Sequence, residues 1–141
     1  MNHNLHHVFL GRFRFKRSVS CPSFSCEGQS FFEELSSGTS SYFEEGFYNL
    51  DGKKQPFYQK RYFQFYPSHL LILKEDQSIL HRFSLKAIIQ FPLKVSHTHV
   101  CSEDLYRCDL VVEGFDKFSM NYNVRGRSKS YEILISYERI N

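Results

Sequence analysis

The sequence predicts a mainly β domain, an antiparallel barrel or sandwich of seven strands capped by a C-terminal α-helix. Two observations predict this class. Short apolar and aromatic runs alternate with turn signals between residues 44 and 124, which is the pattern of a meandering antiparallel sheet. After Gly126, apolar residues fall at helical spacing. With 141 residues, 41% of them hydrophobic, the chain can form one domain with its own core.

Residues 1–41 are expected to be a disordered, basic and serine-rich tail, and residues 42–141 to be the folded domain. The first twenty residues carry four basic side chains and no acidic one. Such a segment is either solvated or drawn to an anionic membrane. The small polar residues 36–41 are typical of a linker.

Seven runs are expected to be strands. They are residues 45–50, 57–66, 69–74, 79–85, 87–95, 105–113 and 117–124. The first run is followed by Asp51-Gly52, a hairpin signal. Because little chain lies between the runs, they predict a sheet that meanders and closes or folds on itself.

The last segment, residues 128–140, is expected to be the helix. Leu134, Tyr137 and Ile140 lie at helical spacing, and Ser128 is a candidate N-cap. Apolar residues also occur at every second position from Tyr131 onward. A strand therefore stays open as the alternative, although we favour the helix.

Charge and cysteine content limit the classes of function. The net charge of +3 is small for a dedicated nucleic-acid-binding protein. The N-terminus lacks the order of a signal peptide, and no apolar run is long enough to span a bilayer. We therefore expect a reduced, cytoplasmic chain whose membrane contact, if it has one, is peripheral at the plasma membrane.

Residues 44–140 resemble a divergent member of the pleckstrin-homology (PH) family. The stretch QKRYFQF (59–65) is similar to the family's second strand, with its two leading basic positions, and EEGFYNL (44–50) is similar to the first. CDLVVEG (108–114) and KFSMNYNV (117–124) are similar to the sixth and seventh strands. The resemblance implies a PH-like barrel with a capping helix. The chain departs from the family because it has no Trp for that helix.

The resemblance also implies a phosphoinositide site formed by Lys53, Lys54 and Arg61. Strand alternation places Arg61 on the same face as Phe63 and Phe65, where it points into the mouth of a barrel. Lysine and arginine neutralise phosphate, and arginine binds it through two nitrogens. Three cations predict weak binding. In the alternative interpretation, Arg61 forms a structural ion pair and the two lysines are ordinary surface residues.

The tail carries a candidate phosphorylation motif in FKRSVSCP (15–22). Arg17 precedes Ser20 by three residues, and Arg17, Ser18, Ser20 and Pro22 together fit the ligand pattern of phosphoserine-reading adaptors. A phosphate adds about −1.5 to −2 charges that an arginine cluster can bind. The alternative is a serine-rich stretch that fits the pattern by chance.

Metal binding and catalysis are not expected. His97, His99 and Cys101 share one face of an extended strand, with Cys108 nearby, and these residue types bind zinc. However, three ligands along one strand rarely complete a tetrahedron. The sequence contains no nucleophile elbow, no phosphate-cradling glycine loop and no convincing carboxylate pair. We expect neither an enzyme nor a bound cofactor.

The expected function is a non-catalytic PH-like targeting and adaptor module that weakly binds anionic phosphoinositide membranes and recruits a signalling partner. The alternative is a PH-like protein-interaction domain without lipid binding. KRYFQFYPSHLLILKED (60–76) resembles PH domains beside Rho-family GTPase regulators, so small-GTPase signalling proteins are candidate partners and the chain is a candidate fragment or isoform of such a regulator. A nucleic-acid-binding barrel is a third, less favoured class, and no nucleic-acid partner is expected.

Overall fold

The computed structural model describes residues 3–21 and 23–140. A short helix, α1 (His3–Phe9), precedes ten strands. The strands are β1 (Gly11–Ser20), β2 (Ser23–Ser36), β3 (Thr39–Leu50), β4 (Lys53–Phe65), β5 (His69–Lys74), β6 (Ile79–Ser84), β7 (Leu93–Cys101), β8 (Asp104–Val112), β9 (Lys117–Arg125) and β10 (Ser130–Arg139). Within the described part of the chain, no helix has the length and apolar character needed to cross a membrane.

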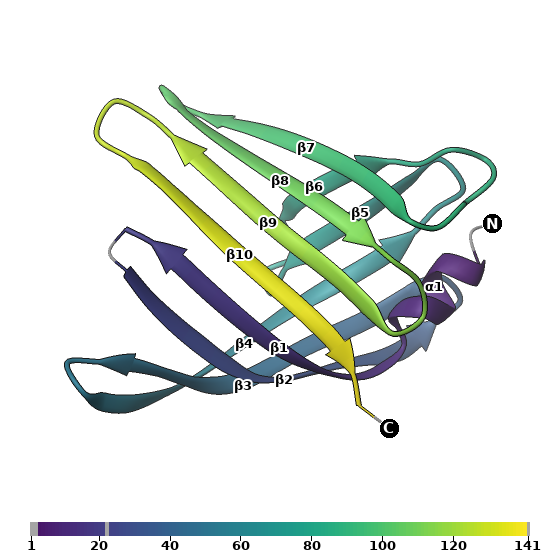
Figure 1. Cartoon of the computed structure of the whole chain (residues 1–141). Helices are drawn as coiled ribbons and strands as arrows, with labels where there is room; N and C mark the ends of the chain where they lie inside the picture. The colour runs from purple at the N-terminus through teal and green to yellow at the C-terminus, as the bar shows by residue number, and fades with distance from the viewer. Residues whose placement is uncertain (1–2, 22, 141) are drawn as a thin grey trace.

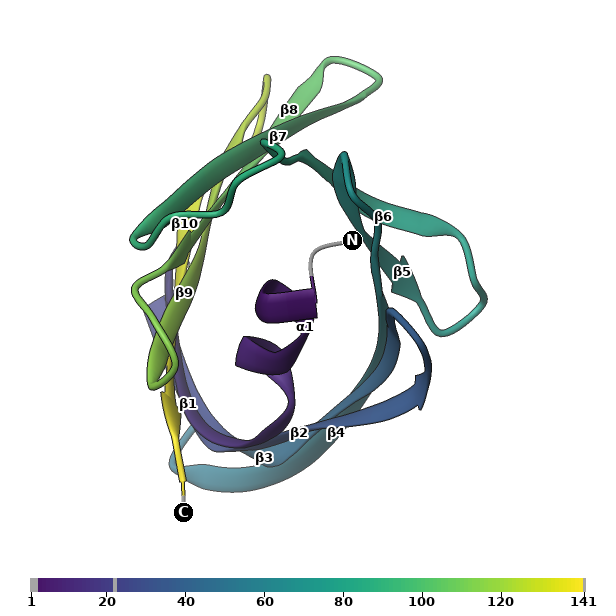
Figure 2. The same ribbon diagram turned by 90° about the vertical axis from the view of Figure 1, so that its right-hand side faces the viewer.

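The ten strands form one antiparallel sheet that rolls into a nearly closed barrel (Figures 1 and 2). Their order is β6-β5-β4-β3-β2-β1-β10-β9-β8-β7. Strands that follow one another in the chain are therefore neighbours, except that β1 pairs with β10 and that β6 and β7 are the two edges. The pairing of β1 with β10, from Phe13↔Arg139 to Val19↔Ile133, joins the two ends of the chain.

Helix α1 lies inside one end of the barrel, as the view in Figure 2 shows. Leu5 and Phe9 are completely buried there. The Phe9 ring contacts the Phe118 ring edge-on, with ring centroids 4.8 Å apart. Arg139 donates to the carbonyl oxygen of Leu10 (2.6 Å) and so satisfies a backbone acceptor just after the helix. The opposite end, called the far end below, carries the β1–β2, β3–β4 and β9–β10 connections (Figure 1).

The expected seven-stranded PH-like barrel with a C-terminal helix is wrong, because the last segment is the strand β10. This strand pairs on both sides, with β1 and with β9. Ile135 and Tyr137 are buried on its inner face, whereas the adjacent Leu134 is 49% exposed. The two-residue alternation therefore prevails over the helical spacing, because ladder hydrogen bonds on both edges and a buried face favour the strand.

The residues expected to be a disordered tail instead form α1, β1, β2 and the first part of β3. In β1, Phe13 and Phe15 are fully buried, whereas Arg12, Arg14 and Lys16 are exposed. The basic composition that suggested a tail thus belongs to one face of a strand. Because side chains alternate between the two faces, the basic and serine residues of the outer face dominate the composition of the segment, although its inner face is apolar.

The expected strand over residues 87–95 begins later, at Leu93, as β7. The chain before it forms the connection between the two edge strands. Pro92 immediately precedes β7, and proline has no N–H for a ladder hydrogen bond. The connection also leaves Ile88 77% exposed. The apolar run AII (87–89) is therefore not part of the sheet.

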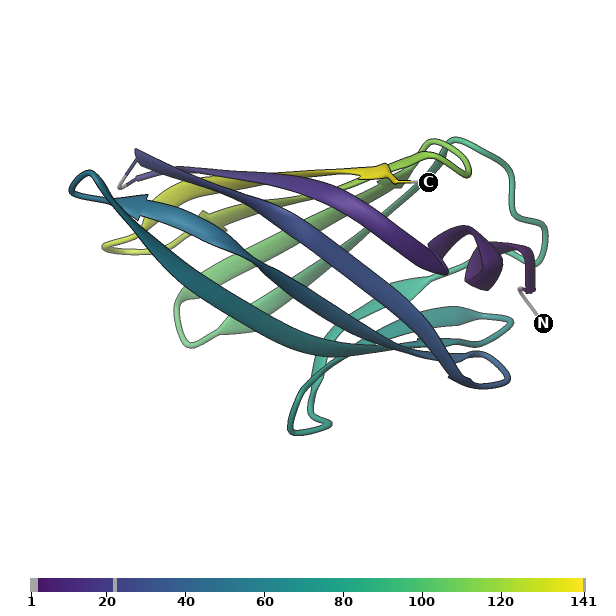
Figure 3. The ribbon, with the colours of Figure 1, turned by 90° about the horizontal axis from the view of Figure 1, so that it is seen from below.

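Gly28 on β2 and Gly46 on β3 are direct cross-strand neighbours in the long curved strands seen from below in Figure 3. A Cβ atom on Gly28 would overlap the carbonyl oxygen of Glu45, and one on Gly46 would overlap that of Glu27. Both carbonyl oxygens belong to the backbone, so they cannot move away by a side-chain rotation. The close approach of the two strands therefore requires glycine at both positions.

We predict that Gly28→Ala lowers the free energy of unfolding by about 3 kcal/mol, because the added methyl group must displace the backbone of β3. Gly114→Ala is the matched control, since a Cβ there meets no atom within 4 Å. Urea denaturation followed by circular dichroism measures both variants. Equal stability of the two variants would show that β2 and β3 do not approach each other as closely as described.

Candidate functional site

A layer of polar side chains crosses the barrel interior beyond the aromatic core around α1. It surrounds a cavity of about 50 Å³. The cavity wall combines charged, amide and phenolic groups with aliphatic ones. The lining residues are Arg17, Tyr42, Glu44, Gln59, Arg61, Phe63, Ile72, Leu80, Met120, Tyr122, Ile135 and Tyr137.

The layer is centred on an ion pair between Arg17 of β1 and Glu44 of β3. Arg17 Nη2 donates to both carboxylate oxygens, at 3.1 and 2.9 Å. The side chains are 16% and 2% exposed. The Tyr42 hydroxyl donates to Glu44 Oε1 (3.1 Å) and is hydrogen-bonded to the Tyr137 hydroxyl (3.2 Å). A carboxylate this deeply buried is stable only with such partners.

Burial and the ion pair act in opposite directions on these groups. Burial disfavours the charged guanidinium of Arg17. The combined attraction of Glu44 and of the neighbouring phenols and thiol outweighs burial and raises the pKa of Arg17. Burial, followed by the nearby charge of Glu44, raises the pKa of Tyr137 to about 12. Burial also raises the pKa of Tyr42. At neutral pH, Arg17 is therefore charged and both phenols are neutral.

Arg61 of β4 faces the same cavity, half-buried. It donates to the carbonyl oxygen of Lys60 (3.2 Å). With its amide oriented to satisfy both neighbours, Gln59 accepts from Arg61 Nη2 (2.6 Å) and donates to Glu44 Oε1 (2.9 Å). Gln59 thus links Arg61 to the ion pair. No carboxylate among the described residues forms an ion pair with Arg61.

A second polar chain runs to the edges of the sheet. His81 of β6 and His97 of β7 place their Nδ1 atoms 3.4 Å apart, so side chains join the two edge strands. His81 Nε2 is hydrogen-bonded to the Tyr122 hydroxyl (2.8 Å), and Tyr122 also contacts the thiol of Cys108.

Burial keeps these groups uncharged at neutral pH. It lowers the pKa of His81 to about 3, with repulsion from His97 and Arg61 as smaller causes. Burial likewise raises the pKa of Cys108 to about 12 and raises that of Tyr122. The pKa of His97 is lowered by burial and by His99.

The structure does not bring the three predicted phosphate-binding cations together. Lys53 and Lys54 are exposed at the start of β4. Arg61 lies seven residues beyond Lys54, about 23 Å along an extended strand, and faces inward. The phosphoserine motif is also divided. Arg17 is held inside by Glu44, and Ser18 is exposed on the outer face.

Ser20 is exposed at the end of β1, where its hydroxyl accepts a hydrogen bond from the backbone N–H of Glu132 (2.8 Å). Pro22 lies outside the described residues. Cys101 is exposed at the end of β7, whereas Cys108 is buried in β8. Over residues 3–21 and 23–140, no group of three or more His, Cys, Asp or Glu side chains is arranged to hold a metal ion.

Sequence reasoning named Arg17 only as part of the phosphoserine motif, and it missed the other central members of the polar layer, namely Tyr42, Glu44, His81 and Tyr137. A signal was present. Glu44 alternates with Tyr42 and Tyr48, so it falls on the apolar face of a strand. Arg17 likewise falls between Phe15 and Val19 on the same face. Charged residues on two apolar faces suggest a buried ion pair.

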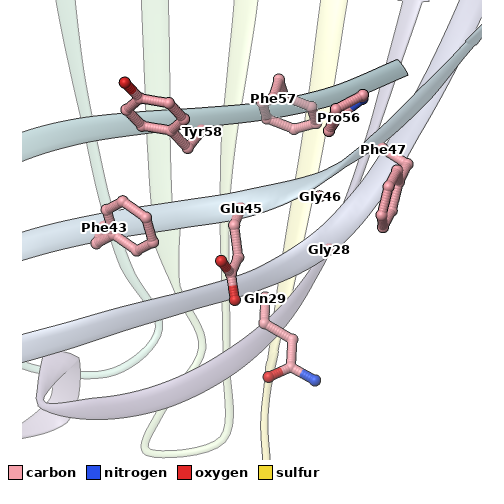
Figure 4. Close-up of a pocket in the computed structure, with 9 residues that line it drawn as sticks. All are labelled: Gly28, Gln29, Phe43, Glu45, Gly46, Phe47, Pro56, Phe57 and Tyr58. Atoms are coloured by element: carbon pink, nitrogen blue, oxygen red, sulfur yellow. The ribbon is translucent and has the colours of Figure 1, made fainter. Parts of the chain in front are cut away.

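A groove of about 720 Å³ also lies on the outer face of β2, β3 and β4 (Figure 4). Phe47 and Tyr58 are 53% and 74% exposed there, and the Phe43 and Tyr58 rings stack with centroids 6.1 Å apart. Glu45 is the one charged side chain among its lining residues. The groove is larger than the interior cavity, but it lacks the buried, hydrogen-bonded polar groups that orient a specific ligand.

The residues that form the barrel match the model of a known sequence family. A model described as a family of unknown function, DUF6314, matches residues 9–139. The chain belongs to DUF6314. The match spans all ten strands, from just before β1 to the last residue of β10. A sequence search of curated proteins finds no match to this DUF6314 chain.

Solved structures share the fold at low sequence identity. The S-type phycobiliprotein lyase CPES from Guillardia theta aligns with a TM-score of 0.65 and 8% identity, over 97% of this chain and 91% of its own. EF1p2_mFAP2b bound to DFHBI aligns with a TM-score of 0.56 and 10% identity, over 97% and 98%. Rv2717c from M. tuberculosis aligns at 0.58 and 10% identity, over 95% and 94%.

These comparisons overturn the resemblance to the PH family. The DUF6314 match covers the expected tail and domain together, and the solved structures that share the fold are β-barrels and not PH domains. The expectation of a phosphoinositide-binding signalling adaptor is therefore wrong as well. It rested on a strand order in which QKRYFQF was the second strand, whereas that segment belongs to β4.

Glu44→Gln should lower the free energy of unfolding by about 3 kcal/mol, because it leaves the buried Arg17 charge without its partner. Asp109→Asn breaks the exposed pair with Arg107, where the side chains are 58% and 40% exposed, and should cost less than about 1 kcal/mol. Denaturant unfolding at pH 7 measures both. A cost for Glu44→Gln no larger than the control would contradict burial of the Arg17–Glu44 pair.

The titration of His81 predicts acid sensitivity. Its pKa is about 3 in the folded state against an ordinary value of 6.5. Below pH 6.5 His81 binds a proton in the unfolded chain but not in the folded one. The free energy of unfolding therefore falls as the pH decreases toward 3. Relative to His81→Gln, the parent should lose about 2 kcal/mol more between pH 7 and pH 5. Parallel curves of unfolding free energy against pH would show that His81 titrates normally.

Proposed function

We propose that the barrel is a binding protein for one small, mainly apolar molecule held in its interior. The observation that carries this proposal is the cavity lined by buried and half-buried polar groups of five different strands, β1, β3, β4, β9 and β10. A cavity of this kind, with a few convergent polar groups in an apolar wall, is the usual form of a small-molecule site.

The apolar part of the proposed site lies between the polar layer and the far end. Tyr48, Phe57 and Ile133 face inward there and are half-buried. The side chains around α1, by contrast, are fully packed. Apolar groups that point into a barrel but remain partly exposed lose free energy to water. A bound molecule would cover them and recover that free energy.

The structural neighbours support this type of function. The solved structure of EF1p2_mFAP2b holds DFHBI, a small molecule, and CPES is a phycobiliprotein lyase. Antiparallel barrels of this kind commonly enclose a ligand cavity.

The proposed role is binding and not catalysis. The buried Cys108 thiol, which faces the polar layer through Tyr122, has its pKa raised to about 12. A thiol in that state is a poor nucleophile, because the thiolate is the reactive form. The carboxylate of Glu44 accepts hydrogen bonds from Arg17 and Tyr42. It is therefore not available to act as a general base.

Titration with the neutral dye N-phenyl-1-naphthylamine tests this proposal, since its fluorescence rises in apolar sites. The parent should bind one dye per chain with saturation. Ile133→Trp fills the inner face and should weaken binding at least about tenfold. The matched control is Leu134→Trp, one residue away on the outer face and 49% exposed, which should bind as the parent does. Failure of the parent to bind would refute the proposal.

A further inference from the structure

We infer that the interior site selects a small organic monoanion, a carboxylate or sulfonate on an apolar body, whose charged group lies against Arg61. This inference rests on the proposed function and specifies its ligand. It follows from the charges in the cavity wall, from the size of the cavity and from the position of Glu44.

The cavity wall carries one positive charge in excess. Its charged lining residues are Arg17, Glu44 and Arg61. Glu44 neutralises Arg17 through two hydrogen bonds from one nitrogen. Arg61 has only neutral acceptors in the described residues, namely the Lys60 carbonyl and the Gln59 amide. A half-buried guanidinium with neutral partners is a strong attractor for an anion, because the surroundings screen its charge less than bulk water does.

The remaining titratable groups around Arg61 do not cancel this charge. His81 faces it from β6 and Tyr122 from β9, and His97 of β7 lies behind His81. Burial disfavours the charged form of each, so all three are neutral at pH 7. Cys108 stays a thiol for the same reason. The excess charge on Arg61 is therefore present throughout the neutral range.

The cavity of about 50 Å³ is too small for a whole organic molecule. It suits a compact head group, because one water molecule occupies about 30 Å³ of liquid. We place the apolar body toward the far end, along Tyr48, Phe57 and Ile133, which pack against the core and are half-buried. This orientation places the charged end on Arg61 and covers the half-buried rings with the apolar end.

Glu44 restricts the charge of the head group to one. Its carboxylate lies in the same wall and is connected to Arg61 through Gln59. A dianion beside Arg61 would bring a second negative charge close to Glu44 in surroundings that screen poorly, so it is disfavoured. The wall thus favours monoanions both over neutral molecules and over dianions.

Two dyes with the same ring system test the inference. 1-Anilinonaphthalene-8-sulfonate carries a sulfonate that N-phenyl-1-naphthylamine lacks. Fluorescence titrations at pH 7.4 in about 0.15 M salt suppress weak surface attraction. The parent should bind the sulfonate at least about tenfold more tightly than the neutral dye. Arg61→Met should lose that preference and keep its affinity for the neutral dye, which also shows that the variant folds.

Three further variants control the result. Lys60→Met removes the same charge from the adjacent outward position and should retain the preference. Arg61→Lys keeps the positive charge and should retain most of the preference for the sulfonate dye. Phe47→Ser alters the outer groove, where its side chain is 53% exposed, and should change neither affinity.

The outcomes separate the two proposals. If the parent binds neither dye, the proposed function fails. If it binds both dyes equally, or if Arg61→Met weakens both equally, the monoanion inference is overturned while interior binding stands. Loss of dye binding in Phe47→Ser would place the dye in the outer groove and overturn both.

Discussion

Two arginines and a single carboxylate share the interior layer of this barrel, and that imbalance determines what the interior can hold. Glu44 is almost completely buried and is fully engaged by Arg17 and Tyr42. Breaking the buried pair would cost several kcal/mol of stability, about 3 or more, so Glu44 does not leave Arg17 to pair with Arg61. Arg61 therefore faces the cavity with only neutral hydrogen-bond partners in the described residues. A bound anion would neutralise its charge.

The closure of the sheet makes this layer an interior. Pairing of β1 with β10 brings Arg17 opposite Ile135, and α1 seals one end with Phe9. Closure thus places Arg17 and the proposed ligand contact Ile133 on the two paired strands, whereas Arg61 lies on β4. The glycine pair Gly28–Gly46 lets β2 and β3 approach each other closely. Because β2 also pairs with β1, Glu44 and Arg17 lie on the same part of the sheet, two strands apart.

Local strand signals were readable from the sequence, whereas the pairing of distant segments was not. Residues 69–74 form β5 as predicted, and the alternation in β4 placed Arg61 on the inner face with Phe63. The N-terminal strands were missed because their outer faces are basic and serine-rich. The polar layer was missed because its members are far apart in the chain. The pairings of β1 with β10 and β2, and of β3 with β2 and β4, bring them together.

The location of a bound monoanion decides whether Arg61 holds its charged group. Intermolecular nuclear Overhauser effects can be measured between 1-anilinonaphthalene-8-sulfonate and the isotope-labelled protein, with the arginine Nε–Hε signals followed in the same titration. We predict dye contacts to Ile133 and Leu80 and a shift of the Arg61 signal larger than that of Arg17. Contacts confined to Phe43, Phe47 and Tyr58, with an unchanged Arg61 signal, would contradict this prediction.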